Sequence, residues 1–307
     1  MIIKIRYKII SIALLSIFFV IILFASLKNN ISEVNTISLK QNSVCVPIIM
    51  YHEVKSFKLG KDVISPYEFE SDLKYLSKNN YTTITMTQLI NYVYNNKDLP
   101  KNPIILSFDD GYLNNYVYVL PLLKKYNAKI VFSIIGKNTD DFTQILDDNL
   151  DYSHVTWDQL NEMIDSGNVE VQNHTYNLHA VNKGRIGCAQ MSGEALSHYE
   201  KIMKDDIGKL QEEITVMTGE TPNTFTYPYG RSSKNTDAIL KELGFQATLS
   251  CDYGVNLITK DANGLYGLRR ICRSHGQSVE KVLTEAMKTL KYRSTTASNR
   301  LRLSPFV

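Results

Sequence analysis

Short apolar runs alternate with segments of helical spacing over residues 46–290, and this alternation limits the chain to a few folds. Strands that alternate with helices form a parallel sheet with the helices packed outside it. Seven or eight strands of this length predict an α/β fold in which the sheet closes into a distorted (β/α) barrel. An open, doubly wound sheet is the alternative. No Gly-x-Gly-x-x-Gly follows a strand, which argues against a nucleotide-binding version of that sheet.

The most informative apolar run lies at residues 104–108 and is followed by Asp109, Asp110 and Gly111. Such a run before Asp-Asp-Gly predicts a buried strand that ends in a tight turn. Two carboxylates then stand at the carboxyl end of a strand, where the loops of an alternating protein converge on an active site. Adjacent carboxylates in a dry pocket need a cation or a proton between them, which suggests a metal ligand beside a proton-transfer base. Taken alone, Asp-Asp-Gly is also common turn chemistry.

A second predicted strand, at residues 168–173, is followed by His174 and His179. Two histidines five apart do not share a helical face as an i,i+4 pair would, but a loop can fold both onto one ion. Neutral imidazoles and one carboxylate form a small open site that suits Zn²⁺ or a similar divalent metal. The histidine pair is weak evidence alone, but with Asp-Asp-Gly at an equivalent strand end it predicts a metal site.

A third predicted strand, at residues 225–227, leads into Pro228, Tyr229 and Gly230. A Pro-Tyr-Gly turn at this place leaves backbone N–H groups pointing into the cleft, where they could stabilise an oxyanion. By itself the same pattern is equally an ordinary turn with a packed tyrosine.

The N-terminus carries Lys4, Arg6 and Lys8 before an uncharged apolar run at residues 9–27. At about 1.5 Å rise per residue, a helix of this length nearly spans a hydrocarbon core, and its basic flank stays on the cytoplasmic side. A cleaved signal peptide is the competing interpretation, with residues 25–27 as a weak cleavage site. We favour an uncleaved anchor because the run is longer than a usual signal core. We therefore expect a single-pass cell-membrane protein with an extracellular catalytic domain, or a secreted one if the segment is cleaved.

These features divide the chain into an anchor or signal segment at 1–27, a polar linker at 28–45, the alternating domain at 46–291 and a loose, polar and basic tail at 292–307. Within the domain, residues 138–153 are acidic and irregular and predict a surface insertion. The net charge of +3 is not gathered into a face that would predict nucleic-acid binding. The four cysteines are widely spaced without a Cys-x-x-Cys pair, which argues against a structural zinc knuckle.

In combination, three motifs resemble the polysaccharide deacetylase family with the NodB-homology domain. They are Ser-Phe-Asp-Asp-Gly-Tyr at 107–112, His-Thr-Tyr-Asn-Leu-His at 174–179 and Tyr-Pro-Tyr-Gly at 227–230. Members of that family are carbohydrate esterases that remove N- or O-acetyl groups from cell-envelope and matrix glycans. The resemblance covers about residues 46–290. Ile-Met-Tyr-His-Glu-Val at 49–54 and the spacing of the two histidines are similar to the branch that contains the biofilm poly-N-acetylglucosamine deacetylases.

Carried over by motif, the resemblance implies a distorted (β/α) barrel, often with seven strands, and a general base at Asp109. It implies a divalent metal, Zn²⁺ before Co²⁺, Ni²⁺ or Fe²⁺, held by Asp110, His174 and His179. The backbone N–H of Tyr229 would complete an oxyanion hole.

The chain departs from the family pattern at two positions. Many members carry an arginine in the third motif, where this chain has Thr226. We regard Arg270, on a later strand, as the candidate to pair with a cleft carboxylate. Members also carry a late histidine as general acid in a Leu-x-His context, and here His275 is the only histidine in that region, out of register. Asp252, at a strand end, is a candidate to orient the acid.

Two further residues are candidates for contact with substrate. His52 ends the first strand on the expected active face, as a substrate or supporting contact, and a purely structural histidine fits it equally. Tyr227, in the third motif, is the other candidate.

The sequence therefore predicts a membrane-anchored, metal-dependent hydrolase that removes acetyl groups from N-acetylated glycans such as poly-N-acetylglucosamine or peptidoglycan. The alternative is a catalytically silent glycan-binding barrel at the cell surface, suggested by the missing late histidine. A glycoside hydrolase would need two carboxylates about 5 to 9.5 Å apart on opposite sides of the scissile bond. Asp109 and Asp110, as neighbours on one turn, fit that requirement poorly. The choice of glycan, metal and proton donor stays open.

Overall fold

A computed structural model of the chain describes residues 43–182 and 184–302, and the side chains of these residues up to 290. The barrel lies within Cys45–Val307, the second of two units into which the chain divides. The expected anchor at 1–27 and most of the expected linker lie outside the described residues. No helix in the described ranges combines the length and the apolar content needed to cross a membrane.

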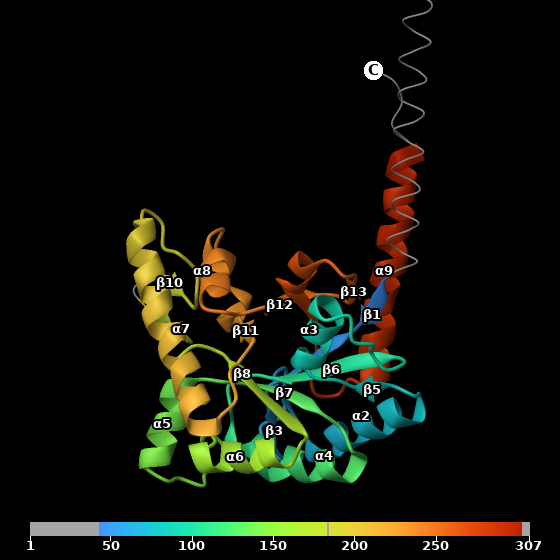
Figure 1. Ribbon diagram of the computed structural model, residues 1–307. Helices are drawn as coiled ribbons and strands as arrows, with labels where there is room; N and C mark the ends of the chain where they lie inside the picture. Colours follow the sequence, from blue (N-terminus) through green and yellow to red (C-terminus); the bar gives the residue numbers. More distant parts are fainter. Residues whose placement is uncertain (1–42, 183, 303–307) are drawn as a thin grey trace, which may run out of the picture. The chain divides into compact units, whose positions relative to one another are not determined.

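In the part of the chain that the structure describes, seven parallel strands close into a barrel (Figure 1). Their order around the ring is the order of the chain: β2 (Ile48–Tyr51), β6 (Pro103–Phe108), β7 (Ile130–Ile134), β8 (Val169–Asn173), β11 (Thr224–Thr226), β12 (Ala247–Tyr253) and β14 (Leu268–Cys272). Strand β2 pairs with both β6 and β14, which closes the ring. The predicted closed parallel sheet is therefore confirmed.

The ring is least regular at β11 and β12. The paired residues of β11 and β8 are Phe225 and Asn173, and the register of β12 against β14 shifts between Leu249 and Tyr253. Register shifts of this kind bend a strand and re-aim its side chains.

Helices pack outside the strands, and Figure 1 shows α4 and α6 along one side of β7 and β8. The helices are α2 (Pro66–Lys78), α3 (Met86–Tyr94), α4 (Leu120–Tyr126), α5 (Gly136–Gln144), α6 (Trp157–Asp165), α7 (Leu196–Thr218), α8 (Thr236–Glu242) and α9 (Val279–Arg302). A π-helical turn, η1 (Asn115–Val119), precedes α4, and 3₁₀ turns occur at η2 (Pro228–Gly230) and η3 (Ala262–Leu265). The remaining short strands are β1 (Val44–Val46), β3 (Glu53–Val54), β4 (Val63–Ile64), β5 (Thr82–Thr83), β9 (Val181–Asn182), β10 (Arg185–Ile186) and β13 (Asn256–Ile258).

Local sequence explains where several helices begin and end. Ser65, Thr85 and Thr156 each accept a hydrogen bond from the backbone three residues on, and the side chain at that position bonds back to the cap. A cap of this kind stabilises a helix by about 1 kcal/mol. Helix α7 ends at Gly219, whose φ of 76° is the left-handed conformation that glycine adopts without strain.

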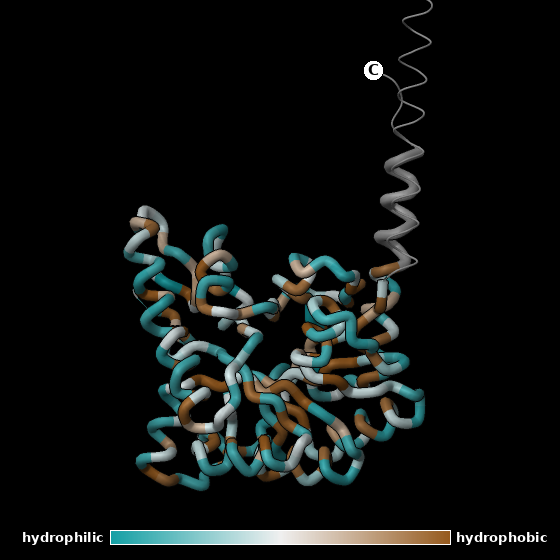
Figure 2. Tube along the Cα trace, in the orientation of Figure 1, coloured by the Kyte–Doolittle hydropathy of each residue, from teal (hydrophilic) through white to brown (hydrophobic). Residues whose placement is uncertain are grey.

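The core follows the strands, where the apolar residues concentrate (Figure 2). All six residues of β6 are buried, as expected for a strand covered on both faces. Phe108 at its end stacks on Tyr51 of β2, with ring centroids 4.8 Å apart. A second apolar cluster, which includes Tyr199 of α7 and Phe225 of β11, lies beside the barrel.

Two predicted irregular segments are helical. Residues 138–153 were predicted as a surface insertion, but α5 occupies most of their first half. That helix lacks the apolar spacing of an ordinary packed helix, because polar contacts hold it in place. One is the bond from Trp157 Nε1 to Asp140. The tail predicted as loose from residue 292 is also wrong up to Arg302, because α9 continues to that residue. Once a helix is nucleated, each further residue adds a backbone hydrogen bond, so a polar sequence can continue it.

Candidate metal centre

A cavity of about 510 Å³ lies at the carboxyl ends of the barrel strands. Parallel strands end on the same rim, so the polar residues that follow them meet there. The residues that line the cavity are His52, Glu53, Lys61, Asp62, Val63, Asp109, Asp110, Tyr112, His174, His179, Tyr229 and Cys251.

Asp110, His174 and His179 gather at one side of this cavity. Asp110 Oδ1 lies 3.4 Å from His174 Nε2 and 3.3 Å from His179 Nε2. One ligand atom from each residue can be chosen so that all lie within 4.8 Å of one another. The structure therefore brings together the carboxylate and the two imidazoles that the sequence suggested.

The protonation pattern of this cluster fits a divalent cation. His174 donates its Nδ1–H to the carbonyl oxygen of Thr226 at 2.7 Å, which leaves the lone pair of a neutral ring on Nε2, toward Asp110. Asp110 Oδ1 is buried and has no hydrogen-bond partner among the described residues. A buried anionic oxygen without a donor is costly unless a cation satisfies it. Two imidazole nitrogens and a carboxylate are a donor set that Zn²⁺ and similar ions accept.

The electrostatics of Asp110 and His179 favour the forms that bind a metal. Burial acts to raise the pKa of Asp110, but the adjacent His174, with the charges of His52 and His179, holds that pKa well below its usual range. Burial and the neighbouring His174 lower the pKa of His179. At neutral pH the carboxyl is therefore ionised and His179 is neutral, the forms that bind a metal. The pKa of His174 is raised, because bonds and charges from Asp110 and Asp109 outweigh the effect of its burial.

Asp109 points to the other side of the turn, where Arg270 holds it. Arg270 Nη1 donates to Asp109 Oδ1 at 2.7 Å, and Nε of the same guanidinium donates to the carbonyl oxygen of Ser250 at 2.7 Å. Burial acts to raise the pKa of Asp109, but the charges of Arg270, His174 and His52 outweigh it and the pKa is lowered. Asp109 is therefore an ionised carboxylate at the cavity wall. Its arginine partner comes from β14, whereas the third motif, where many family members carry an arginine, has Thr226 in this chain.

His52 lines the cavity beside this pair, because the strand that it follows, β2, is paired with β6. Its Nε2 is 4.0 Å from Asp109 Oδ2 and its Nδ1 is 4.0 Å from Asp62 Oδ1. Asn115 Nδ2 donates to the backbone carbonyl of His52 at 2.7 Å, which fixes the loop after β2. The imidazole therefore lies near the carboxylate oxygen of Asp109 that Arg270 does not bond.

Tyr229 forms the third wall through the turn η2. Its ring centroid lies 4.5 Å from that of His179, and 47% of the residue is exposed to solvent. Two backbone bonds hold the turn: the Gly230 N–H donates to the Tyr227 carbonyl oxygen, and the Arg231 N–H donates to that of Pro228. The Tyr229 N–H takes part in neither bond.

Each of the three motif turns contains a non-glycine residue with positive φ. Asp110, Thr175 and Tyr229 have φ values of 74°, 76° and 57°, a region that non-glycine residues rarely adopt. Such conformations persist only where the surroundings enforce them. At Asp110 the enforcing group is His154, whose Nδ1–H donates to the Asp110 carbonyl oxygen at 3.1 Å while its ring stacks on Tyr112. Sequence reasoning missed His154, and no motif marks it.

Arg270 reaches the cavity only through Asp109, and three other residues proposed from the sequence do not line it. His275 is on an exposed loop and its Nδ1 pairs with Glu68 at 2.9 Å, so the suggestion that it is the proton donor does not fit its position. Asp252 is exposed on β12, beyond the cavity wall. Tyr227 turns away from the cavity, with its hydroxyl bonded to Asp237 and its ring packed on Phe225. Its predicted contact with substrate is therefore corrected to a role in the core.

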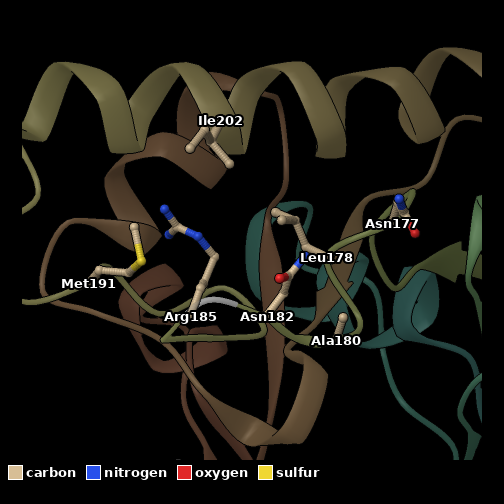
Figure 3. A pocket seen from close by; sticks show the side chains of 7 residues that line it. All are labelled: Asn177, Leu178, Ala180, Asn182, Arg185, Met191 and Ile202. Carbon is tan, nitrogen blue, oxygen red and sulfur yellow. The ribbon is translucent and has the colours of Figure 1, made fainter.

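A smaller cavity of about 270 Å³ lies beside the loop that carries His179 (Figure 3). Arg185 lines it, and the guanidinium donates to the Ala189 carbonyl oxygen and pairs with Glu194. The charge of this arginine is therefore neutralised from within the protein.

The sequence matches known proteins over most of the barrel. Residues 96–248 match the polysaccharide deacetylase family. A Bacillus subtilis relative named as a polysaccharide deacetylase is 29% identical over 234 residues, which cover 76% of this chain and 73% of the relative. A poly-beta-1,6-N-acetyl-D-glucosamine N-deacetylase of Staphylococcus aureus is 26% identical over 246 residues, covering 74% of this chain and 78% of the relative. The Escherichia coli protein of that name is 24% identical, and the match spans only 33% of its length.

The fold is also similar to solved structures. The structure of IcaB from Ammonifex degensii superposes with a TM-score of 0.63 and 26% identity, covering 79% of this chain and 96% of that one. The motif turns, the cavity that they form and these matches agree, and the chain belongs to the polysaccharide deacetylase family of enzymes.

Proposed function

We propose that this polysaccharide deacetylase is a metal-dependent de-N-acetylase of poly-N-acetylglucosamine or a closely related N-acetylated glycan. The observation that carries the proposal is the pairing of two differently supported carboxylates in one cavity. Asp109 is ionised and held by Arg270, whereas Asp110 faces His174 and His179. The substrate class is supported by the relatives from S. aureus and E. coli, whose names specify that glycan.

The side chains divide the hydrolysis between them. Asp109 accepts a proton from the water whose oxygen bonds to the acetyl carbon. The Tyr229 N–H stabilises the negative charge that develops on the carbonyl oxygen. As the carbon–nitrogen bond breaks, the leaving nitrogen takes a proton, and acetate and a free sugar amine result. A divalent ion held by Asp110, His174 and His179 would supply a Lewis acid that polarises the acetyl group and lowers the pKa of a nearby water.

His52 is our candidate for the group that protonates the leaving nitrogen. It lines the cavity, and its Nε2 lies 4.0 Å from the outer oxygen of Asp109. His52 and Asp109 follow the paired strands β2 and β6, so an acid and a base lie side by side at the same scissile bond. His275, the donor considered from the sequence, pairs with Glu68 away from that cavity.

We further propose that residues 9–27 anchor the domain to the outer face of the cell membrane. The support is the uncharged apolar run with three basic residues before it. Fractionation of cells that carry the full chain should place it in the membrane, open to protease added outside. Release of a shortened protein into the medium would indicate a cleaved signal instead.

The activity is tested by acetate release from poly-N-acetylglucosamine, acetylated chitooligosaccharide and peptidoglycan, with and without added Zn²⁺ or Co²⁺. We expect release from the first substrate, dependent on metal and lost in Asp109→Asn. Appearance of reducing ends in place of acetate would indicate a glycoside hydrolase. Metal binding without acetate release on any substrate would support the silent glycan-binding barrel, against which the Arg270-paired Asp109 and the adjacent His52 argue.

A further inference from the structure

The loop between β8 and β9 carries both histidines of the metal cluster, and its first half is bonded to neighbouring elements. The N–H of His174 donates to Ile134 at 3.0 Å, which continues the pairing of β8 with β7. The carbonyl oxygens of Thr175 and Tyr176 accept from Gly136 and Lys137, at the start of α5. His174 is therefore placed by the barrel itself.

His179 lies five residues further on and lacks this support. Its ring rests on Tyr229, 4.5 Å between centroids, and faces the ring of His174 at 4.9 Å. The Nδ1–H bond to a strand carbonyl that orients His174 is not among the contacts described for His179. The position of the His179 imidazole therefore depends on the backbone that leads to it.

A carboxylate from helix α7 accepts successive N–H groups of that backbone. Asp206 Oδ1 accepts the N–H of Tyr176 and Oδ2 accepts the N–H of Asn177, both at 2.9 Å. A bond from the Leu178 N–H adds to these two. Burial raises the pKa of Asp206 to about 6, against the effect of these bonds, so the group is mainly ionised at neutral pH. Bonds from N–H groups to an ionised carboxylate are about twice as strong as neutral ones.

We propose that Asp206 is a positioning residue for the metal centre: by clamping residues 176–178 it holds His179 within reach of Asp110 and His174. The inference rests on the proposed metal-dependent function, since it concerns the geometry of the same cluster. It adds a residue that touches neither the metal ligands nor the substrate and that no motif marks. Outer partners that orient ligands commonly contribute about 10- to 100-fold to metal affinity.

The test is a measurement of Zn²⁺ binding to the metal-free full chain by titration calorimetry. Asp206→Ala should weaken binding about 10- to 100-fold. The matched control is Asp205→Asn. Asp205 is the neighbouring acid and pairs with Lys201, and no contact to the loop is described for it, so this variant should leave Zn²⁺ binding unchanged. Asp206→Ala that binds Zn²⁺ as tightly as the wild type would overturn the proposal.

A double variant separates positioning from a general loss of structure. His179→Ala removes the ligand that Asp206 is inferred to hold, so Asp206→Ala should weaken binding no further in that background. If the two effects simply add, Asp206 acts on the whole domain and the proposal fails. Asp206→Asn keeps an acceptor oxygen but presents an amide N–H to a loop N–H, so its affinity should lie between those of the wild type and Asp206→Ala.

Hydrogen exchange gives a readout that needs no metal. In Asp206→Ala and Asp206→Asn the amides of residues 176–178 should exchange faster, while those of β6 and β7 keep their protection. Unchanged protection of the loop would contradict the inference. A wild-type protein that binds no Zn²⁺ or Co²⁺ would refute the proposed metal dependence, whereas the exchange result would still decide whether Asp206 clamps the loop.

Discussion

Arg270 and Asp109 form a buried ion pair between the last strand of the barrel and the end of β6. Arg270 Nη1 lies 2.7 Å from Asp109 Oδ1, and the exposed fractions of the two residues are 1% and 2%. The guanidinium keeps an otherwise desolvated carboxylate ionised. A base of this kind is available over a wide pH range. The pair also links folding to activity, since each partner is needed for the other to be buried.

Removal of the guanidinium should move the acidic limb of the rate profile to higher pH. In Arg270→Met burial of Asp109 is no longer opposed by its main partner, so its pKa rises and less of the base is ionised at a given pH. Breaking a buried pair also costs about 3–5 kcal/mol of folding free energy. The pH dependence of kcat/KM for acetate release, together with urea unfolding, measures both effects. Arg269→Met, a change at the neighbouring arginine, for which no bond to Asp109 is described, is the control; an unshifted acidic limb in Arg270→Met would contradict the assignment.

Substitution at the two adjacent aspartates should have different consequences. Asp109→Asn should reduce kcat by about 10²- to 10⁴-fold, the usual contribution of a general base, and leave Zn²⁺ affinity within a few-fold. Asp110→Asn should reduce metal affinity and activity together, because the amide lacks the charge that faces His174 and His179. Calorimetric Zn²⁺ titration beside acetate release separates the two. Equal loss of metal binding in both variants would merge their roles.

His52→Gln should affect substrates according to their leaving group. Expulsion of a sugar amine requires a proton, whereas the 4-nitrophenolate of 4-nitrophenyl acetate leaves without one. The variant should therefore lose most activity on N-acetylated glycan and retain most activity on the aryl ester. The ratio of the two kcat/KM values is the measurement. A parallel loss on both substrates would remove His52 from the role of proton donor.

Glu68 should make the domain sensitive to acid. Burial acts to raise its pKa, but bonds from the Ser65 backbone, His275 and the Gly276 backbone outweigh it and lower the pKa to about 2. A carboxyl with a depressed folded-state pKa contributes stability that is complete above its unfolded pKa and is lost as pH falls through the folded value. Urea midpoints should therefore drop between pH 4.5 and about 2. Glu68→Gln should be less stable than the wild type at pH 7 and show a flatter decline; identical declines would exclude Glu68 as the cause.

The candidate site could be predicted where it follows from local sequence. Asp109 and Asp110 follow an apolar run and His174 follows a predicted strand, and parallel strands place such residues on one rim. His179 came from its motif and from chemistry, since a loop can bring it back to the same ion. The closed barrel followed from the alternation and the number of strands.

The remaining residues depend on contacts that no local pattern encodes. His52 and Arg270 reach Asp109 because β2 pairs with both β6 and β14, a relation between the two ends of the domain. Tyr227 has its position because η2 turns the chain immediately after it. His154 acts on the Asp110 carbonyl through a bridge between residues 112 and 154.

The closure of the ring by β2 and β14 also sets when activity can first arise during biosynthesis. Strand β2 can complete its pairing only when β14 is present. Arg270, the partner of Asp109, belongs to that same last strand. A nascent polypeptide that has emerged only as far as β12 already contains Asp110, His174 and His179 but lacks the partner of Asp109. On the proposed mechanism, catalysis would therefore begin only after synthesis has delivered the last strand.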